Sequence, residues 1–253
     1  MWLLAVGLAD AAFGLTERLR PRARYVISLG AAVVAVTAGG LGVAWEAQSI
    51  VATASWAAVT VVLWQVLRGT GEPRAQWRSA AALLVISVFA GVTVLALGWW
   101  SDPAGGLLAR VLRRSPIPSL SQLAADRALL LLGIAVALIE TANVAVRLTL
   151  DATQVTFPRS RLRGGRIIGP VERLLVFGFA LAGEFTGAAL IVSAKTLLRF
   201  PEVSGAAGSG SSTADDADLK TKQPSLAEIT EYFLVGSLIS WFLALVAATI
   251  ARA

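Results

Sequence analysis

Long apolar runs separated by short polar segments dominate the chain. A membrane-spanning helix needs about 20 mainly apolar residues. The runs that satisfy or approach this requirement cover residues 1–15, 25–45, 50–67, 79–100, 120–150, 169–200 and 233–250. The pattern therefore predicts an all-α fold, a polytopic transmembrane helix bundle of about seven spans, or six if the short first run does not cross.

A connector that contains Pro and Gly divides these runs into two halves. We expect a four-span half over 1–118 and a three-span half over 119–253. Apolar and basic positions alternate in the connector at helical spacing: Leu107, Leu108, Arg110, Val111, Leu112, Arg113 and Arg114. This spacing predicts a short amphipathic helix on the membrane surface, with an ordinary basic loop as the alternative.

Local signals predict where the helices of the second half begin. Ser119 with Gln122 resembles a capping box, so we expect the fifth helix to run from Leu120 to about Leu150. Gly169–Pro170 is expected to open a sixth helix that continues to Phe200. Residues 204–223 are rich in Gly, Ser, Ala and Asp, which predicts a flexible loop. Ser225 with Glu228 then marks the start of the last helix.

Composition excludes a soluble globule. Hydrophobic residues make up 56% of the 253 residues, and charged residues only 15%, against roughly 25% in soluble domains. The net charge of +6 comes from basic residues that flank the apolar runs, which is typical of membrane topology signals rather than of nucleic-acid binding. The basic clusters at 18–24, 68–78 and 159–166 favour an N-terminus outside and a C-terminus inside.

The absence of Cys and His removes many kinds of chemistry. Disulfides, thiolate or imidazole metal sites and Ser–His–Asp triads are excluded. The sequence also contains no nucleotide-binding loop. We therefore expect no enzyme activity, no catalytic residue, no metal and no cofactor.

Three motifs in the second half point to a family. They are Gly165–Arg173 (GRIIGPVER), Ala194–Glu202 (AKTLLRFPE) and Glu231–Ser237 (EYFLVGS). Together they resemble the C-terminal half of an uncharacterised family of bacterial polytopic membrane proteins. The resemblance covers about 90 residues and implies a helix bundle in the bacterial cytoplasmic (inner) membrane. It transfers no activity, and the His- and Asp-containing segment with which the family begins is absent here.

Charged residues on the expected sixth helix form one pattern. Arg173, Glu184 and Lys195 are spaced by 11 residues, so they lie near one helix face. Glu184 falls in the middle of an apolar run, where an ionisable residue should face protein or water. It is either a proton- or cation-binding carboxylate on a transport path or a neutral group in a helix interface. Arg173 and Lys195 are expected to reach opposite membrane interfaces.

Other polar residues interrupt the apolar runs. Glu140 and Asn143 lie on one face of the expected fifth helix and are predicted partners of Glu184. Asp10 is an acid in the first run. Arg166, Arg173 and Lys195 are candidates for binding an anion or a lipid headgroup.

These features favour a non-catalytic membrane component that binds a partner. The expected partners are membrane lipids, a second copy of the chain or another membrane protein, and no nucleic acid. The alternative is a small transporter or ion-conducting protein that uses the intramembrane carboxylates.

Overall fold

The computed structural model describes residues 1–16, 18–42, 46–68, 76–96, 106–152, 165–194, 197 and 226–252. Its helices are α1 Trp2–Leu15, α2 Pro21–Gly42, α3 Ala47–Arg68, α4 Gln76–Ala96, α5 Gly106–Arg113, α6 Pro118–Ser121, α7 Ala125–Ile139, α8 Thr141–Ala152, α9 Gly165–Ala182 and α11 Leu226–Arg252. A further helix covers Phe185–Ala194. The described residues form no strand, so the all-α prediction is confirmed.

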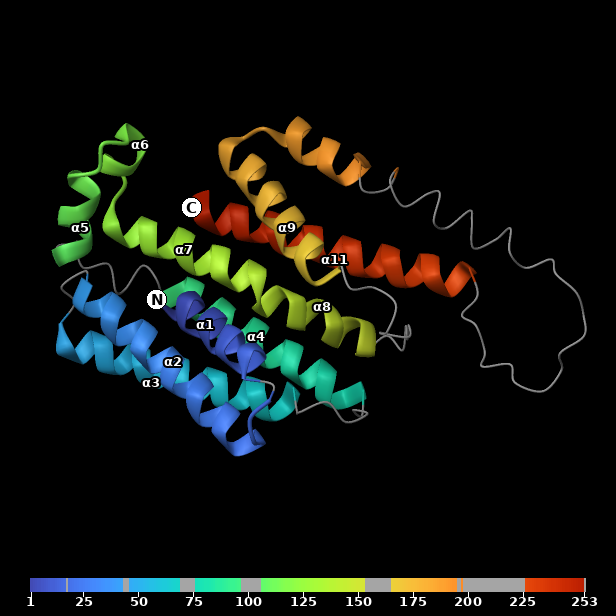
Figure 1. The fold of residues 1–253 in the computed structure, drawn as a ribbon, viewed down its shortest axis with the longest axis horizontal. Coiled ribbons are helices and arrows are strands. Elements are labelled where there is room, and N and C mark those ends of the chain that lie inside the picture. Colours follow the sequence, from blue (N-terminus) through green and yellow to red (C-terminus); the bar gives the residue numbers. More distant parts are fainter. Residues whose placement is uncertain are drawn as a thin grey trace, which may run out of the picture.

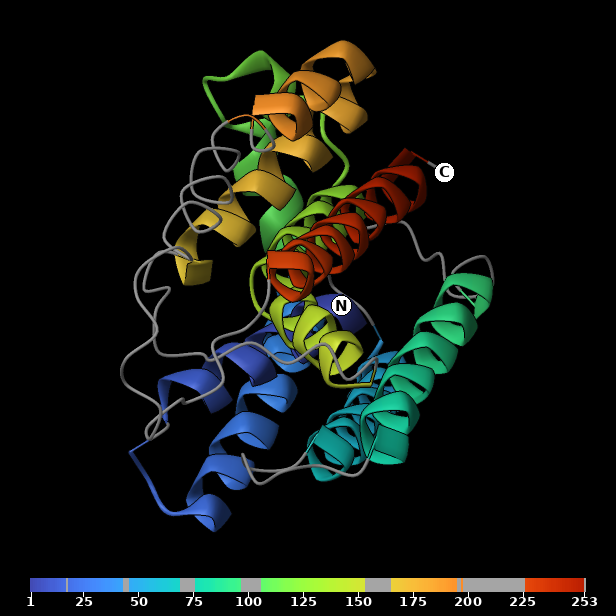
Figure 2. The same ribbon diagram turned by 90° about the vertical axis from the view of Figure 1, so that its right-hand side faces the viewer.

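Most of the helices lie along the long axis of the molecule (Figure 1). A view along that axis shows α2–α4 on one side of the molecule and α7, α9 and α11 on the other (Figure 2). The short helix α1 lies between the two groups and packs on both α2 and α7. The fold is therefore organised around a helix that is itself too short to cross a membrane, since its 14 residues extend about 21 Å.

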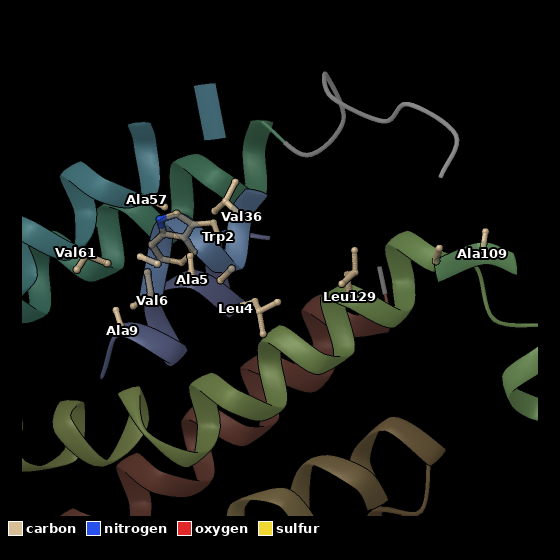
Figure 3. Close-up of a cluster of buried hydrophobic side chains, with 13 residues drawn as sticks. Trp2, Leu4, Ala5, Val6, Ala9, Val36, Ala57, Val61, Ala109 and Leu129 are labelled. Carbon is tan, nitrogen blue, oxygen red and sulfur yellow. The ribbon is translucent and has the colours of Figure 1, made fainter. Parts of the chain in front are cut away.

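Buried apolar side chains surround α1. Trp2, Val6 and Ala9 meet Val36 of α2 and Val61 of α3 in one cluster (Figure 3). The same cluster extends to Ala109 of α5 and to Ala125 and Leu129 of α7. Two glycines allow α1 and α7 to approach closely: a Cβ on Gly7 would lie 2.8 Å from Val136 Cγ1, and one on Gly133 would lie 3.0 Å from the Leu4 backbone nitrogen.

The outer surface is apolar while the interior contains polar residues. Large hydrophobic side chains are exposed along the helices, including Val34, Val51, Leu84, Leu190 and Phe242. Buried polar residues include Asp10, Ser28, Gln65, Glu172 and Arg173. This distribution is typical of a bundle whose outside faces lipid and whose polar groups pair with one another.

The expectation of about seven spans is wrong for the described chain. Three helices are long and apolar enough to cross a membrane, namely Pro21–Leu41, Ala47–Arg68 and Thr230–Arg252. A fourth span is formed if α7 and α8, which are bent by 41°, are taken together. The other apolar helices within the described residues, Trp2–Leu15, Trp77–Thr93 and Phe185–Ala194, are shorter than this requirement.

The expected sixth helix is broken at Gly183. Its backbone has a φ of +84°, which L-residues with a Cβ rarely adopt. The amide of Gly183 donates to the Ala180 carbonyl and that of Glu184 to the Phe179 carbonyl, at 3.1 and 2.9 Å. These two bonds are those of a Schellman motif, with glycine at the position where that motif favours it. Gly187 then packs on the Phe179 ring, which holds the Phe185–Ala194 helix against α9.

This turn changes where the last helix ends. Met1 and the end of α11 lie at the same end of the bundle (Figure 1). Arg127, near the start of α7, donates to the Ala251 carbonyl at 3.4 Å, while Leu4 lies against Gly133 of α7. The predicted ends on opposite sides depend on a sixth helix that continues from Gly169 to Phe200, and the turn at Gly183 interrupts that helix.

Helix starts agree with the sequence in some places and not in others. The amphipathic helix expected in the connector is present as α5. The capping box at Ser119 is wrong, because Pro118 takes the first position of α6 and α7 begins only at Ala125. α9 begins at Gly165 rather than at Gly169, so Pro170 lies inside it. α11 begins at Leu226. The expected loop 204–223 and the Ser225 cap lie outside the described residues.

Candidate functional site

Three residues one helical turn apart on α3 meet α1. Thr60, Trp64 and Arg68 are spaced by four residues, which places them on one helix face. Trp2 Nε1 donates to Thr60 Oγ1 at 3.0 Å, and Arg68 forms an ion pair with Asp10. Trp2 and Asp10 are eight residues apart on α1, and their partners Thr60 and Arg68 are eight residues apart on α3. The two helices therefore run in the same direction.

Asp10 is the buried acid of this group. It is 2% exposed, and Trp64 Nε1 lies 3.0 Å from its Oδ1 and 3.2 Å from its Oδ2. The Arg68 guanidinium donates to Oδ1. The carboxylate is therefore compensated both by an opposite charge and by an indole N–H, as a charge removed from water requires.

Phe13 positions two guanidinium groups beside this ion pair. The Arg24 and Arg68 guanidinium carbons lie 4.0 and 4.5 Å from the centroid of its ring. Arg24 also donates to the Phe13 carbonyl at 3.2 Å. These cation–π contacts join α1 to Arg24 of α2 and to Arg68 of α3.

A second polar chain joins α1, α2 and α3 at the same depth. Ser28 Oγ donates to the Ala9 carbonyl at 2.9 Å, and Gln65 Nε2 donates to Ser28 Oγ. Both Ser28 and Gln65 are buried. Ala9 precedes Asp10 and Gln65 follows Trp64, so the two sets of contacts lie side by side.

Polar contacts also hold α9 in the second group of helices. Arg173 is 2% exposed and donates from Nη2 to Asn143 Oδ1 of α8. Trp241 Nε1 of α11 donates to Glu172 Oε1 at 2.6 Å. Adjacent residues of α9 therefore bind two different helices.

Glu140 lies near both polar groups. It occupies the bend between α7 and α8, and its carboxylate is close enough to act electrostatically on both Asp10 and Arg173. The hydroxyl of the next residue, Thr141, is buried near Asp10. The bend thus places one acid near both the Asp10–Arg68 pair and Arg173.

The structure brings together four of the residues singled out from the sequence. Asp10, Glu140, Asn143 and Arg173 all lie in this interior region. The prediction that Arg173 reaches a membrane interface is wrong. Its side chain lies inside the bundle, where it donates to Asn143. The side chain of Arg166 and all of Lys195 lie outside the described residues.

Glu184 is not part of this region. It lies in the turn after Gly183 and is exposed. The expected pairing of Glu184 with Glu140 and Asn143 is therefore wrong, because the helix that was to carry Glu184 to mid-depth ends before it. The Arg252 side chain lies near this turn, 5.7 Å from the centroid of the neighbouring Phe185 ring.

Several residues of the polar core were not anticipated. The apolar run 50–67 stops before Arg68, and the apolar pattern predicts no role for Trp64, Thr60 or Trp241. A usable signal existed in α3, where polar and indole-bearing residues recur every four positions within an apolar run. Such a stripe indicates a helix face that meets other polar groups rather than lipid.

This arrangement can fix helices in place and can shield charge from lipid. Among the described residues, no three carboxylates gather closely enough to hold a metal ion. Comparison with family models, with curated proteins and with solved structures gives no match for the chain.

Proposed function

We propose that the protein is a non-catalytic integral component of the bacterial cytoplasmic membrane, in which the buried charges hold the helices together. The observation that carries this proposal is the pairing of Asp10 with Arg68 and Trp64 at a site that is almost fully buried. A carboxylate that binds a transported ion must exchange its partner for that ion. Asp10 instead has one cationic and one indole partner on a helix that packs against its own.

The role of such a component is to bind lipids, further copies of itself or another membrane protein. The apolar outer surface and the close glycine contacts between helices suit this role. The resemblance of 165–253 to a bacterial membrane family, carried by its three motifs, agrees with the proposed location.

The basic residues favour one orientation. Arg18, Arg20, Arg22, Arg24, Arg68 and Arg78 lie toward the end of the bundle opposite Met1, and the sequences that join α3 to α4 and α8 to α9 add Arg74, Arg159, Arg161 and Arg163, whereas Arg110, Arg113, Arg114, Arg127 and Arg252 lie toward the Met1 end. An excess of arginine is typical of the cytoplasmic side. We therefore place that end in the cytoplasm and both Met1 and Arg252 outside, which revises the expected orientation of the last helix.

A second candidate function is ion transport, and one observation favours it. Glu140 lies at a 41° bend within a membrane-length helix pair, near Asp10 and Arg173. Interrupted helices often carry the coupling-ion sites of secondary transporters.

Measuring proton flux distinguishes the non-catalytic membrane component from the ion transporter. The purified full chain, reconstituted into vesicles that contain a pH-sensitive dye, is expected to leave an imposed pH gradient as stable as in empty vesicles. The Glu140→Gln variant is expected to behave in the same way, because Gln keeps the shape of the side chain and cannot titrate.

A gradient that collapses with the natural chain and persists with Glu140→Gln, at equal thermal stability, would overturn the proposal in favour of transport. Native mass spectrometry of the same preparation in mild detergent provides the positive test. It is expected to detect a second copy, a membrane protein or retained lipid on the chain. A bare monomer without lipid would contradict the binding role.

A further inference from the structure

Helix α5 has an apolar side that packs on the bundle. Leu108 and Leu112 contact the core cluster around α1, and Ala109 is a buried member of that cluster. These positions are separated by one and four residues, so they form one helix face. This face fixes α5 against the end of the bundle where α7 begins (Figure 1).

A second apolar strip on α5 has no partner in the described chain. Leu107 and Val111 are 63% and 58% exposed, and they too are four residues apart. Ile117 and Leu120, in the turn and short helix that follow, are also exposed. An apolar strip on the end of a bundle, rather than on its lipid-facing sides, needs a specific explanation.

Arginines flank the exposed strip. Arg110, Arg113 and Arg114 are all exposed. The sequence has no acidic residue from Gly106 to Ala125, so no carboxylate of this segment neutralises them. Arg110 makes one weak contact within the described residues, from Nε to the Gly106 carbonyl at 3.5 Å.

The location of α5 matches the boundary of a membrane. The ends of α2 and α4 and the start of α7 lie at this end of the bundle (Figure 1). In a bundle whose long helices span a membrane, a helix at this end lies where hydrocarbon gives way to headgroups. Apolar side chains of such a helix enter the acyl region, while its basic side chains remain at the level of the phosphates.

We propose that α5 is a binding segment for anionic phospholipids. Leu107 and Val111 insert among the acyl chains, and Arg110, Arg113 and Arg114 bind lipid phosphates. Guanidinium groups suit this ligand because they donate two parallel hydrogen bonds to one phosphate. Anionic lipid is favoured over an acidic protein because the arginines flank an apolar strip at membrane depth.

Lipid quenching at a single site tests this proposal, since the chain has no Cys. Bimane attached to Val111→Cys is measured in vesicles that carry equal fractions of brominated phosphatidylglycerol or brominated phosphatidylcholine. We expect phosphatidylglycerol to quench it several-fold more strongly, because each basic side chain near the surface strengthens the preference by about fivefold. The combined variant Arg110→Gln, Arg113→Gln and Arg114→Gln is expected to lose this preference.

Bimane at Leu238→Cys, an exposed position in the middle of α11, is the matched control. It is expected to be quenched equally by both lipids, and equally in the arginine variant, which also confirms that this variant folds. Equal quenching at position 111 by the two lipids would overturn the proposal, as would a preference that survives the three substitutions. Protection of position 111 from both lipids would overturn it in favour of a protein partner.

Discussion

Replacing Arg68 by methionine is expected to lower the free energy of unfolding by about 3–5 kcal/mol, because it leaves the Asp10 carboxylate buried without its cation. Asp10 is 2% exposed, so water cannot replace the lost guanidinium. The substitution also removes a cation–π contact with Phe13. Unfolding of the detergent-solubilised full chain by increasing mole fractions of a denaturing detergent measures this loss.

Two variants separate the buried charge from other effects. The double variant Asp10→Asn with Arg68→Met is expected to recover most of the stability, because Asn still accepts from Trp64 and carries no charge. Arg78→Met is the matched control, since Arg78 donates to a single backbone carbonyl, that of Val66, in an exposed contact. A loss for Arg68→Met no larger than that for Arg78→Met would show that the ion pair does not hold the helices.

Gly7→Ala is expected to destabilise the bundle by about 1–3 kcal/mol, although alanine is the better helix former. The new Cβ would lie 2.8 Å from Val136 Cγ1 and 3.0 Å from the Ala137 backbone nitrogen. Because backbone atoms of α7 stand in the way, α1 must move outward and lose contact with the core. The same unfolding measurement applies.

Gly30→Ala supplies the comparison. A Cβ at Gly30 would meet no heavy atom within 4 Å, and the residue lies within α2. Its substitution should leave the unfolding free energy unchanged or raise it by up to about 1 kcal/mol. If the two alanine variants are equally stable, α1 and α7 do not approach as closely as described.

Helix positions were predictable from the sequence where apolar runs are long and uninterrupted. The run 50–67 became α3, Ala47–Arg68, because about 20 apolar residues leave the backbone no other way to satisfy its hydrogen bonds in lipid. The break at Gly183 was not predicted, although a glycine that ends a helical run is a known stop signal. Hydrophobicity continues through this turn, so the apolar pattern alone does not reveal it.

Several residues of the polar core could be predicted from the sequence, but their partners could not. Asp10, Glu140 and Asn143 were identifiable because polar groups within apolar helices are costly unless they are paired. The partner of Asp10 is 58 residues away in the chain, on a helix whose neighbours only the fold determines. Arg68 ends its helix, so its position in the sequence resembles that of the loop arginines that follow it.

The central place of α1 was also hidden from the sequence. Fourteen residues are too few to cross a membrane, and length alone therefore suggested a marginal first span. Its importance comes from two properties that a length criterion ignores. It carries an acid that binds α3, and it has a glycine that lets α7 approach.

Side-specific labelling of single cysteines tests most directly whether the bundle crosses a membrane with Met1 and Arg252 at one end. Leu19→Cys lies where α1 joins α2, while Ile117→Cys and Arg252→Cys lie at the end of the bundle where α7 begins and α11 ends, and all three positions are exposed. In intact cells, an impermeant maleimide is expected to label positions 117 and 252 and to reach position 19 only after permeabilisation. Labelling of positions 19 and 117 from the same side would contradict the account, and so would labelling of position 252 together with position 19.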